Sequence, residues 1–396
     1  MRPAKIYSAM REHFLLDPAI TFLNHGSYGA CPKPVFDDYQ RWQREMESNP
    51  VAFLGRRSAA LLGAARGALA GFVGAASEDL VFVNNATTGV NAVTRSVDLL
   101  PGDEVLGTDH EYGACEATWQ QACADQGASY RRVRIPLPFD PARFVERVLA
   151  ALTPRTRLVF ASHVTSTTAL IFPVAALCAA LRERGIASCI DGAHAPGQVL
   201  LDLEGIGADY YTGNCHKWLC APKGSAFLHV RNERQATLHA PVVSWGYVAD
   251  QTVGSGESAF DGFTGRTLLE RRLQWQGTRD VAAYLAVPAA IEFARQHDTG
   301  TTSARCHVLA LETQARVLAR NGMTPIAPDD SFAQMVPIPV RTADGMALRQ
   351  ALFDEHRIEV PVTQHEGQAF VRVSVAAYTT QAELDRLVSV LATLQV

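Results

Sequence analysis

The feature that most constrains the fold is a short apolar run that stops at a carboxylate. Residues 186–190 read Ile-Ala-Ser-Cys-Ile, and Asp191 and the small-residue turn Gly-Ala-His194-Ala-Pro-Gly follow at once. A buried strand with this ending places its last residues at the carboxyl edge of a parallel sheet, where open α/β folds bind ligands. The sequence therefore predicts an α/β fold with Asp191 and His194 at a binding edge.

A lysine follows in the segment Thr-Gly-Asn214-Cys-His216-Lys217-Trp-Leu. An amine shielded from water can form an imine with an aldehyde, and an aspartate can keep a pyridine ring protonated so that the ring accepts electrons. Lys217 and Asp191 are thus the pair that pyridoxal phosphate requires. Taken alone, Lys217 has the alternative of an ordinary solvated surface charge.

Apolar runs and helical patterns alternate around this pair, as is typical of a parallel sheet. We expect strands at 80–83, 104–107, 130–135, 158–161 and 224–230. We expect helices at 35–47, 55–74, 85–99, 114–125, 141–152, 280–296, 303–320 and 343–355. The strands expected at 332–340 and 370–375 belong to a second, α+β unit.

Hydroxyl side chains stand where the first of these strands turns into a helix, at Thr87 and Thr88. Free amides at a helix start and nearby hydroxyls suit a phosphate group. Threonine is also a common N-cap, so a structural role is the alternative. A glycine-containing loop at 24–29 is open to the same two interpretations, a ligand contact or a plain turn.

Composition excludes several classes of protein. The chain has 396 residues, 47% hydrophobic and 19% charged, and a formal net charge of -4, which indicates a globular protein with no nucleic-acid or anionic-membrane partner. Its eight cysteines have no CxxC pair and no zinc-like spacing with histidine, so we expect reduced cysteines and no metal site. No signal peptide and no membrane span is expected, and cytoplasmic localisation follows as a prediction.

Six motifs in order carry a resemblance that spans nearly the whole chain. They are Leu-Asn24-His25-Gly-Ser-Tyr28-Gly, Asn-Ala-Thr87-Thr88-Gly, Asp191-Gly-Ala-His194, His216-Lys217, Gln-Gly-Thr278-Arg-Asp and Val-Arg372-Val-Ser. The chain resembles the class V aminotransferase family of fold-type I pyridoxal-phosphate enzymes, within it the isopenicillin-N epimerase-like subgroup. The resemblance implies a large domain with a mostly parallel, seven-stranded-type sheet and a small C-terminal α+β domain.

The same resemblance implies a role for individual residues. Lys217 would bind the cofactor covalently, Arg372 would bind the substrate carboxylate, and Thr278 would reach the phosphate of a partner subunit in a homodimer. Cofactor contacts are expected from Thr87, Thr88, Tyr112, Ser166, Asp191, His194, Asn214, His216, Lys217 and Thr278. Substrate contacts are expected from Asn24, His25, Tyr28 and Arg372, with the variable side-chain pocket formed by the loops 24–29 and 244–265.

The residue that stacks on the cofactor ring is less well defined. Cysteine desulfurases have a histidine there, and alignment on the acidic residue places Glu111 at that position, with His110 and Tyr112 on either side. We select Tyr112 as the stacking group. A catalytic role is also open to it, because inversion at the α-carbon needs a second acid, for which Tyr112, His25 and Tyr28 are the candidates.

The expected domains are an N-terminal arm at 1–22 that associates with the small domain, a large cofactor-binding domain at 23–290 and a small domain at 291–396. The expected function is epimerisation of a small amino-acid substrate through an imine at Lys217. A β-lyase of the hercynylcysteine sulfoxide lyase type is the alternative. A cofactor-binding regulator without turnover is disfavoured, since nothing that resembles a DNA-binding domain precedes the fold.

Overall fold

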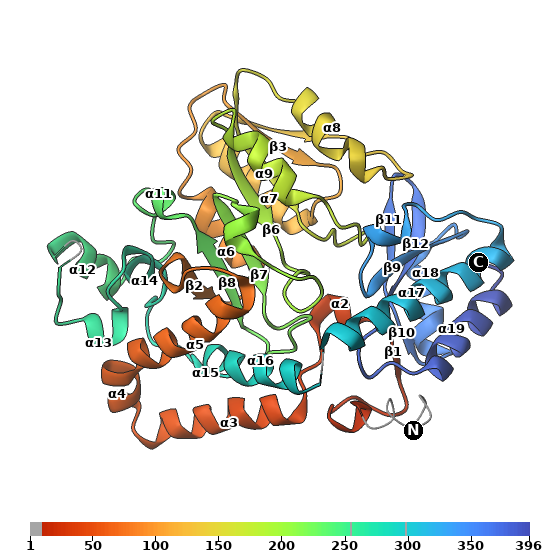
Figure 1. Ribbon diagram of the computed structural model, residues 1–396, viewed down its shortest axis with the longest axis horizontal. Helices are drawn as coiled ribbons and strands as arrows, with labels where there is room; N and C mark the ends of the chain where they lie inside the picture. The colour runs from red at the N-terminus through yellow and green to blue at the C-terminus, as the bar shows by residue number, and fades with distance from the viewer. Residues whose placement is uncertain (1–9, 254–255, 298) are drawn as a thin grey trace.

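The computed structural model describes residues 10–253, 256–297 and 299–396, and its centre is a seven-stranded sheet (Figure 1). Strand β8 runs against both of its neighbours, whereas the other strands share one direction, so that their carboxyl ends meet at one edge. In spatial order the strands are β2 (Leu80–Val83), β8 (Ala226–Val230), β7 (Tyr210–Asn214), β6 (Ala187–Asp191), β5 (Thr156–Ser162), β3 (Glu104–Thr108) and β4 (Ser129–Val133).

Helices cover both faces of this sheet, which is why its inner strands are buried along their length and carry apolar side chains with little alternation. A short helix, α2 (His25–Tyr28), precedes them. The helices of this part are α3 (Lys33–Ser48), α4 (Pro50–Ala52), a π-helix (Phe53–Arg57), α5 (Ser58–Val73), α6 (Ala86–Thr94), α7 (Gly113–Asp125), α8 (Phe144–Ala150), α9 (Val174–Arg182), α10 (Leu203–Ile206), α11 (Asn232–Gln235), α12 (Trp245–Val253), α13 (Asp261–Thr264), α14 (Leu268–Leu273), α15 (Ala282–Leu285) and α16 (Val287–Gln296).

A smaller unit follows, in which a three-stranded antiparallel sheet packs against helices (Figure 1). Its elements are α17 (Thr299–Asn321), β9 (Met335–Val340), α18 (Gly345–Asp354), β10 (Ile358–Glu359), β11 (Val362–His365), β12 (Gln368–Ser374) and α19 (Gln381–Thr393). The strand β1 (Thr21–Phe22) pairs with β10, so residues 21–22 are attached to this unit. The boundaries at residues 22 and 290 stay a prediction, which the pairing of β1 supports for the N-terminal arm.

Three elements differ from the sequence-based expectation. The helix expected to reach Leu99 ends at Thr94, where the hydroxyls of Thr94 and Ser96 bond to backbone carbonyls of the preceding turn. The helix expected at 280–296 is divided into α15 and α16, because Pro288 lies in the first turn of α16 and has no amide to continue the earlier helix.

The third difference is the segment 244–265, expected to be a loop over the substrate pocket. It contains α12 and α13, and these helices lie at the end of the molecule away from the C-terminal sheet (Figure 1). Residues 254–255 of this segment are outside the described part. None of the described helices is long and apolar enough to cross a membrane.

Candidate active site

A cavity of about 600 Å³ opens at the carboxyl edge of the large sheet, between that sheet and the C-terminal unit. It collects side chains from five strand ends and from the smaller unit, because the strands that share one direction deliver their last residues to the same edge. Its lining includes Gly26, Ser27, Tyr28, Asn84, Asn85, Ala86, Thr87, Tyr112, Ser162, Val164, Ser166, Asp191, Ala193, His194, Asn214, His216, Lys217, Gly224, Arg349, Pro361, Val362, Thr363 and Arg372.

Lys217 lies three residues after the end of β7 and lines the cavity. The amine Nζ is 3.0 Å from Nε2 of His194. Burial, together with the positive charge of Arg372, lowers the pKa of Lys217 to about 8, while the charge of Asp191 acts the other way. A lysine with this pKa has a substantial unprotonated fraction near neutral pH, as imine formation requires.

Asp191 ends β6 and presents a carboxylate at the same cavity. One oxygen accepts the amide of Ala193 at 2.9 Å, and the other is 3.6 Å from the thiol of Cys115. Burial raises the pKa of Asp191 above its ordinary value, although the Ala193 amide and the charge of Lys217 act the other way. A cationic N–H in the cavity would stabilise the ionised carboxylate far better than a thiol does, so this site fits a protonated pyridine nitrogen.

Two histidines of the lining are held neutral. Burial and the charges of Lys217 and Arg372 lower the pKa of His194 well below its ordinary value, and burial lowers the pKa of His216 to about 4. Nδ1 of His216 donates to the carbonyl of Ser225 at 2.8 Å, which leaves Nε2 free to accept. Nδ1 of His194 is buried and has no hydrogen-bond partner among the described residues, a cost that a polar ligand atom would relieve.

The start of α6 forms the other end of the cavity. The Asn85 side chain accepts the amide of Thr88 at 2.8 Å, and the Asn214 side chain accepts the amide of Ala86 at 2.8 Å. These two bonds leave the amide of Thr87 in the first turn for a ligand. Gly89 lets the helix approach β7, because a Cβ there would lie 2.4 Å from the hydroxyl of Thr212. Amides at a helix start suit a phosphate, so the lining as a whole fits pyridoxal phosphate.

Arg372 enters the cavity from β12 and is buried. Its guanidinium donates to the backbone carbonyl of Ser166, contacts the Ser166 hydroxyl at 3.3 Å and donates to the Ser27 hydroxyl at 3.2 Å. Burial lowers the pKa of Arg372 to about 10, so the side chain stays cationic at neutral pH. No carboxylate of the described residues pairs with it, which fits the role of a substrate-carboxylate ligand.

Four of the predicted site residues do not line this cavity. Asn24 bonds to Glu359 at 3.1 Å and to Ser27 at 2.6 Å, and Thr88 turns its hydroxyl to Asn85. Thr278 is exposed and lies outside the lining formed by its own chain.

His25 is the fourth. Its ring is 2.8 Å from the hydroxyl of Tyr378 and 3.0 Å from the carbonyl of Lys217, so it faces the backbone behind the lysine. Burial lowers the pKa of His25 to about 3, and the described structure does not support its candidacy as a second acid.

The three candidates for the ring-stacking position differ in whether they line the cavity. Of His110, Glu111 and Tyr112, Tyr112 is the residue that lines the cavity, and it is 47% exposed. Glu111 is buried behind β3 and accepts the hydroxyls of Thr108 and Ser162 at 2.6 and 2.7 Å. The structure therefore places Tyr112 where a ligand can reach it.

His110 belongs to a separate cluster. Its ring stacks on His365 with centroids 4.0 Å apart, and Asp109 lies near enough for the three to hold a metal ion. Both nitrogens of His110 already have partners, the carbonyl of Ile135 and the hydroxyl of Thr168, so the cluster has an evident structural role.

Sequence reasoning missed several lining residues from the C-terminal unit, among them Arg349, Val362 and Thr363. Arg349 lies within the helix that the sequence did predict. Its position there gives no signal that the helix is folded against the mouth of a site about 130 residues earlier in the chain.

Comparison with known proteins gives the class first. The profile described as "Aminotransferase class-V" matches residues 22–387, so the chain belongs to the class V aminotransferase family. This membership confirms the predicted family and fold class, and with the fit of the cavity it confirms the prediction of a pyridoxal-phosphate enzyme.

The chain is also similar to individual proteins of known name. The chain is 40% identical over 395 residues to isopenicillin N epimerase of Amycolatopsis lactamdurans, covering 98% of both chains. It is 38% identical over 385 residues to isopenicillin N epimerase of Streptomyces clavuligerus, covering 96% of both. In fold it is similar to a cysteine desulfurase of Thermococcus onnurineus, with a TM-score of 0.80, 19% identity, and coverage of 100% of this chain and 98% of the other.

Proposed function

We propose that the protein is an epimerase that inverts the α-carbon of an amino-acid group in a substrate like that of the isopenicillin N epimerases. The observation that carries this proposal is the identity of about 40% to such an enzyme over nearly the whole of both chains. The cavity is compatible with it, since the amine of Lys217 and the hydroxyl-bearing side chains of Tyr28 and Tyr112 all line one space.

Pyridoxal phosphate, when bound, supplies an electron sink that weakens the bond to the α-proton. The chain supplies the proton transfers and the orientation. Arg372 would bind the substrate carboxylate through its fork, and the Lys217 amine would remove the α-proton. His194, neutral and 3.0 Å from that amine, would orient it by a hydrogen bond.

Inversion needs a second group that delivers a proton to the opposite face. We assign this role to Tyr112, which lines the cavity and would lie against the cofactor, with Tyr28 as the competing candidate. Tyr28 is 74% exposed and follows Ser27 in α2, whose hydroxyl accepts a hydrogen bond from Arg372. Tyrosine hydroxyls can hold and move a proton, and both residues line a cavity from which a bound substrate would displace water.

The test is a matched pair of variants assayed in deuterium oxide with the L-form of an aminoadipyl peptide. Tyr112→Phe should still exchange the α-proton for deuterium, because Lys217 is intact, yet it should produce D-product about 100-fold more slowly. Tyr28→Phe should invert at close to the wild-type rate. The reverse pattern would transfer the role to Tyr28.

The same assay addresses the alternative function. Incubation of the wild-type protein with cysteine conjugates would release a keto acid and ammonia if the enzyme were a C–S β-lyase. Such release without inversion of any amino acid would contradict the epimerase proposal and favour the lyase.

The position of the cysteines does not support the activity of a persulfide-forming desulfurase. The segment between β10 and β12 contains no cysteine, and none of the eight cysteines, all of them in the described part of the chain, lines the cavity. Burial raises the pKa of Cys115 and Cys189 above the ordinary value, so these thiols are poor nucleophiles.

We also propose a homodimer with a shared active site, in which Thr278 reaches the phosphate of the partner's cofactor. Support comes from the exposure of Thr278 and from the position of α12 and α13, which lie at the end of the molecule away from the C-terminal sheet (Figure 1) and contribute no residue to the lining. Light scattering should give about twice 42.9 kDa, and a fully active monomer would remove Thr278 from the site. A cytoplasmic location stays a prediction from composition.

A further inference from the structure

The cavity has more positive charge than the proposed cofactor and an amino-acid carboxylate account for. Among its described lining residues, Lys217, Arg349 and Arg372 are cationic, and Asp191 is the single carboxylate. Lys217 is committed to the cofactor, Asp191 to its ring nitrogen and Arg372 to the α-carboxylate. The phosphate fits at the start of α6, whose residues Ala86 and Thr87 line the cavity. Arg349 is left without an anion.

Arg349 also has no partner among the residues that the structure describes. It is exposed on α18, and no hydrogen bond or ion pair links it to another described residue. The hollow next to it is also lined by Asp354 and Glu359, and the Glu359 carboxylate accepts the side-chain amide of Asn24 at 3.1 Å. An unpaired guanidinium at the mouth of a binding cavity suits a carboxylate from outside the chain.

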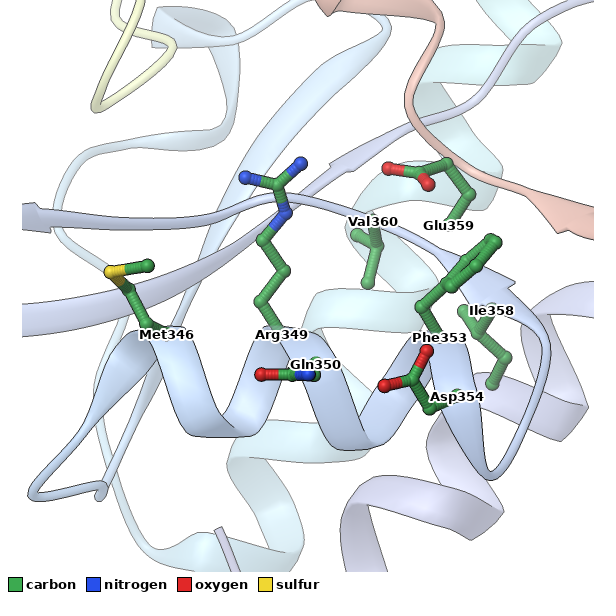
Figure 2. Close-up of a pocket in the computed structure, with 8 residues that line it drawn as sticks. All are labelled: Met346, Arg349, Gln350, Phe353, Asp354, Ile358, Glu359 and Val360. Carbon is green, nitrogen blue, oxygen red and sulfur yellow. The ribbon is translucent and has the colours of Figure 1, made fainter.

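A second hollow, of about 280 Å³, adjoins the cavity at this residue (Figure 2). Arg349 is the residue that lines both spaces, and Figure 2 shows its side chain standing up from α18 on one side of the hollow, with Phe353 and Ile358 on the other. The hollow gives a substrate room to extend past the guanidinium. Its remaining charges, Asp354 and Glu359, are negative, so an acidic group is best placed at Arg349 and not beyond it.

We propose that Arg349 forms a second carboxylate subsite, which selects amino-acid substrates that carry a further acidic group at the far end of a long side chain. This inference rests on the proposed function and specifies its substrate class. Arg372 then binds the α-carboxylate that every amino acid has. Arg349 binds a second carboxylate, which an extended, peptide-like substrate has and a simple free amino acid lacks.

The experiment titrates the holoenzyme with matched probes and follows the visible absorption of the cofactor, which reports binding without turnover. The probes are δ-(L-α-aminoadipyl)-valine and the same compound with its terminal carboxylate converted to the carboxamide. The wild-type protein should bind the acid about 10- to 100-fold more tightly than the amide, as expected for a charge-assisted hydrogen bond.

Two variants and a control assign the effect. Arg349→Gln should bind both probes with the weaker affinity of the amide, and Arg349→Lys should retain part of the preference because it retains the charge. Arg320→Gln is the control, since Arg320 is equally exposed, on α17, and lines neither hollow. It should behave as the wild-type protein does.

Each contrary outcome has a distinct meaning. Equal binding of acid and amide by the wild-type protein, or a preference that survives in Arg349→Gln, would overturn the subsite. Equal weakening of both probes in Arg349→Gln would also overturn it, because Arg349 would then bind a group that both share. A cofactor spectrum that responds to no amino acid at all would instead refute the proposed function, and the subsite with it.

Discussion

The cavity has two unlike walls. The strand-end wall, formed by Asp191, His194, Asn214 and Lys217, is largely buried, and each of its side chains has a hydrogen-bond partner in the chain. The open wall, formed by Tyr28, Tyr112 and Arg349, is exposed. A buried, bonded wall has one geometry and suits a ligand that is always the same, whereas an exposed wall is free to meet different substrates. We therefore expect changes in the first to abolish cofactor chemistry and changes in the second to alter selectivity.

The largest effect is expected from Lys217→Ala. The variant should lose the visible absorption of the bound cofactor and at least about a thousandfold in activity, because the lysine both holds the aldehyde and moves the α-proton. Absorption spectra and α-deuteration rates measure the two losses. Lys33→Ala, an exposed lysine on α3, is the control and should be yellow and active. A yellow, active Lys217→Ala would end the proposed role of this lysine.

A smaller but still large effect is expected from Asp191→Asn. The variant should retain much of its cofactor, which Lys217 and the α6 end still hold, and should lose about 100-fold or more in activity because the ring nitrogen is no longer kept protonated. Comparison of cofactor content with the rate of α-proton exchange separates binding from chemistry. Equal activity of variant and wild type would refute the electron-sink role.

The two walls also differ in how far the sequence could predict them. Asp191, Asn214 and Lys217 stand at or just after strand ends, and the rule that parallel strands deliver their carboxyl ends to one edge is enough to bring them together. The strands expected at 80–83, 104–107, 130–135, 158–161, 186–190 and 224–230 lie within two residues of β2, β3, β4, β5, β6 and β8, because buried apolar runs have an unambiguous pattern. Strand β7 was not among the expected strands.

The open wall depends on contacts between segments far apart in the chain. Arg349 reaches the cavity because α18 packs against β11, and His25 misses it because its ring turns back to Tyr378 and the Lys217 backbone. The hydrophobic periodicity of a single segment predicts neither of these side-chain positions. The prediction of a loop over residues 244–265 was wrong for the related reason that glycine content concealed two short helices, α12 and α13.

A third prediction concerns the effect of the Arg372 charge on Lys217 of the strand-end wall. Arg372 is one cause of the lowered pKa of Lys217, after burial. In Arg372→Gln the pKa of Lys217 should therefore move up from about 8 towards the ordinary lysine value. Competitive labelling of the cofactor-free protein with acetic anhydride over pH 6 to 11, read by mass spectrometry, measures this pKa directly.

Arg349→Gln is the matched control for this measurement. Arg349 lines the same cavity but is not among the charges that shift the pKa of Lys217. Labelling profiles that coincide for all three proteins would show that burial alone sets the reactivity of the lysine.

The smallest effect concerns stability and is expected at Glu111, which stands behind the strand-end wall and not on it. Burial raises the pKa of Glu111 from 4.5 to about 8, against the opposing bonds from Thr108 and Ser162. Between these two pH values the folded protein holds a proton that the unfolded chain has released. The free energy of unfolding must therefore fall as pH rises through this window, by up to ~1.4 kcal/mol per pH unit from this group.

Glu111→Gln removes the titration and keeps a side chain of the same shape that can bond both hydroxyls. Urea unfolding of the holoenzyme at pH 5, 6, 7 and 8 should thus show a weaker loss of stability with pH in the variant, and a variant at least as stable as the wild type at pH 8. Glu312→Gln, exposed on α17, should leave the wild-type pH profile unchanged. A variant with the wild-type slope would mean that Glu111 is ionised in the folded protein, so that a second negative charge is buried near Asp191.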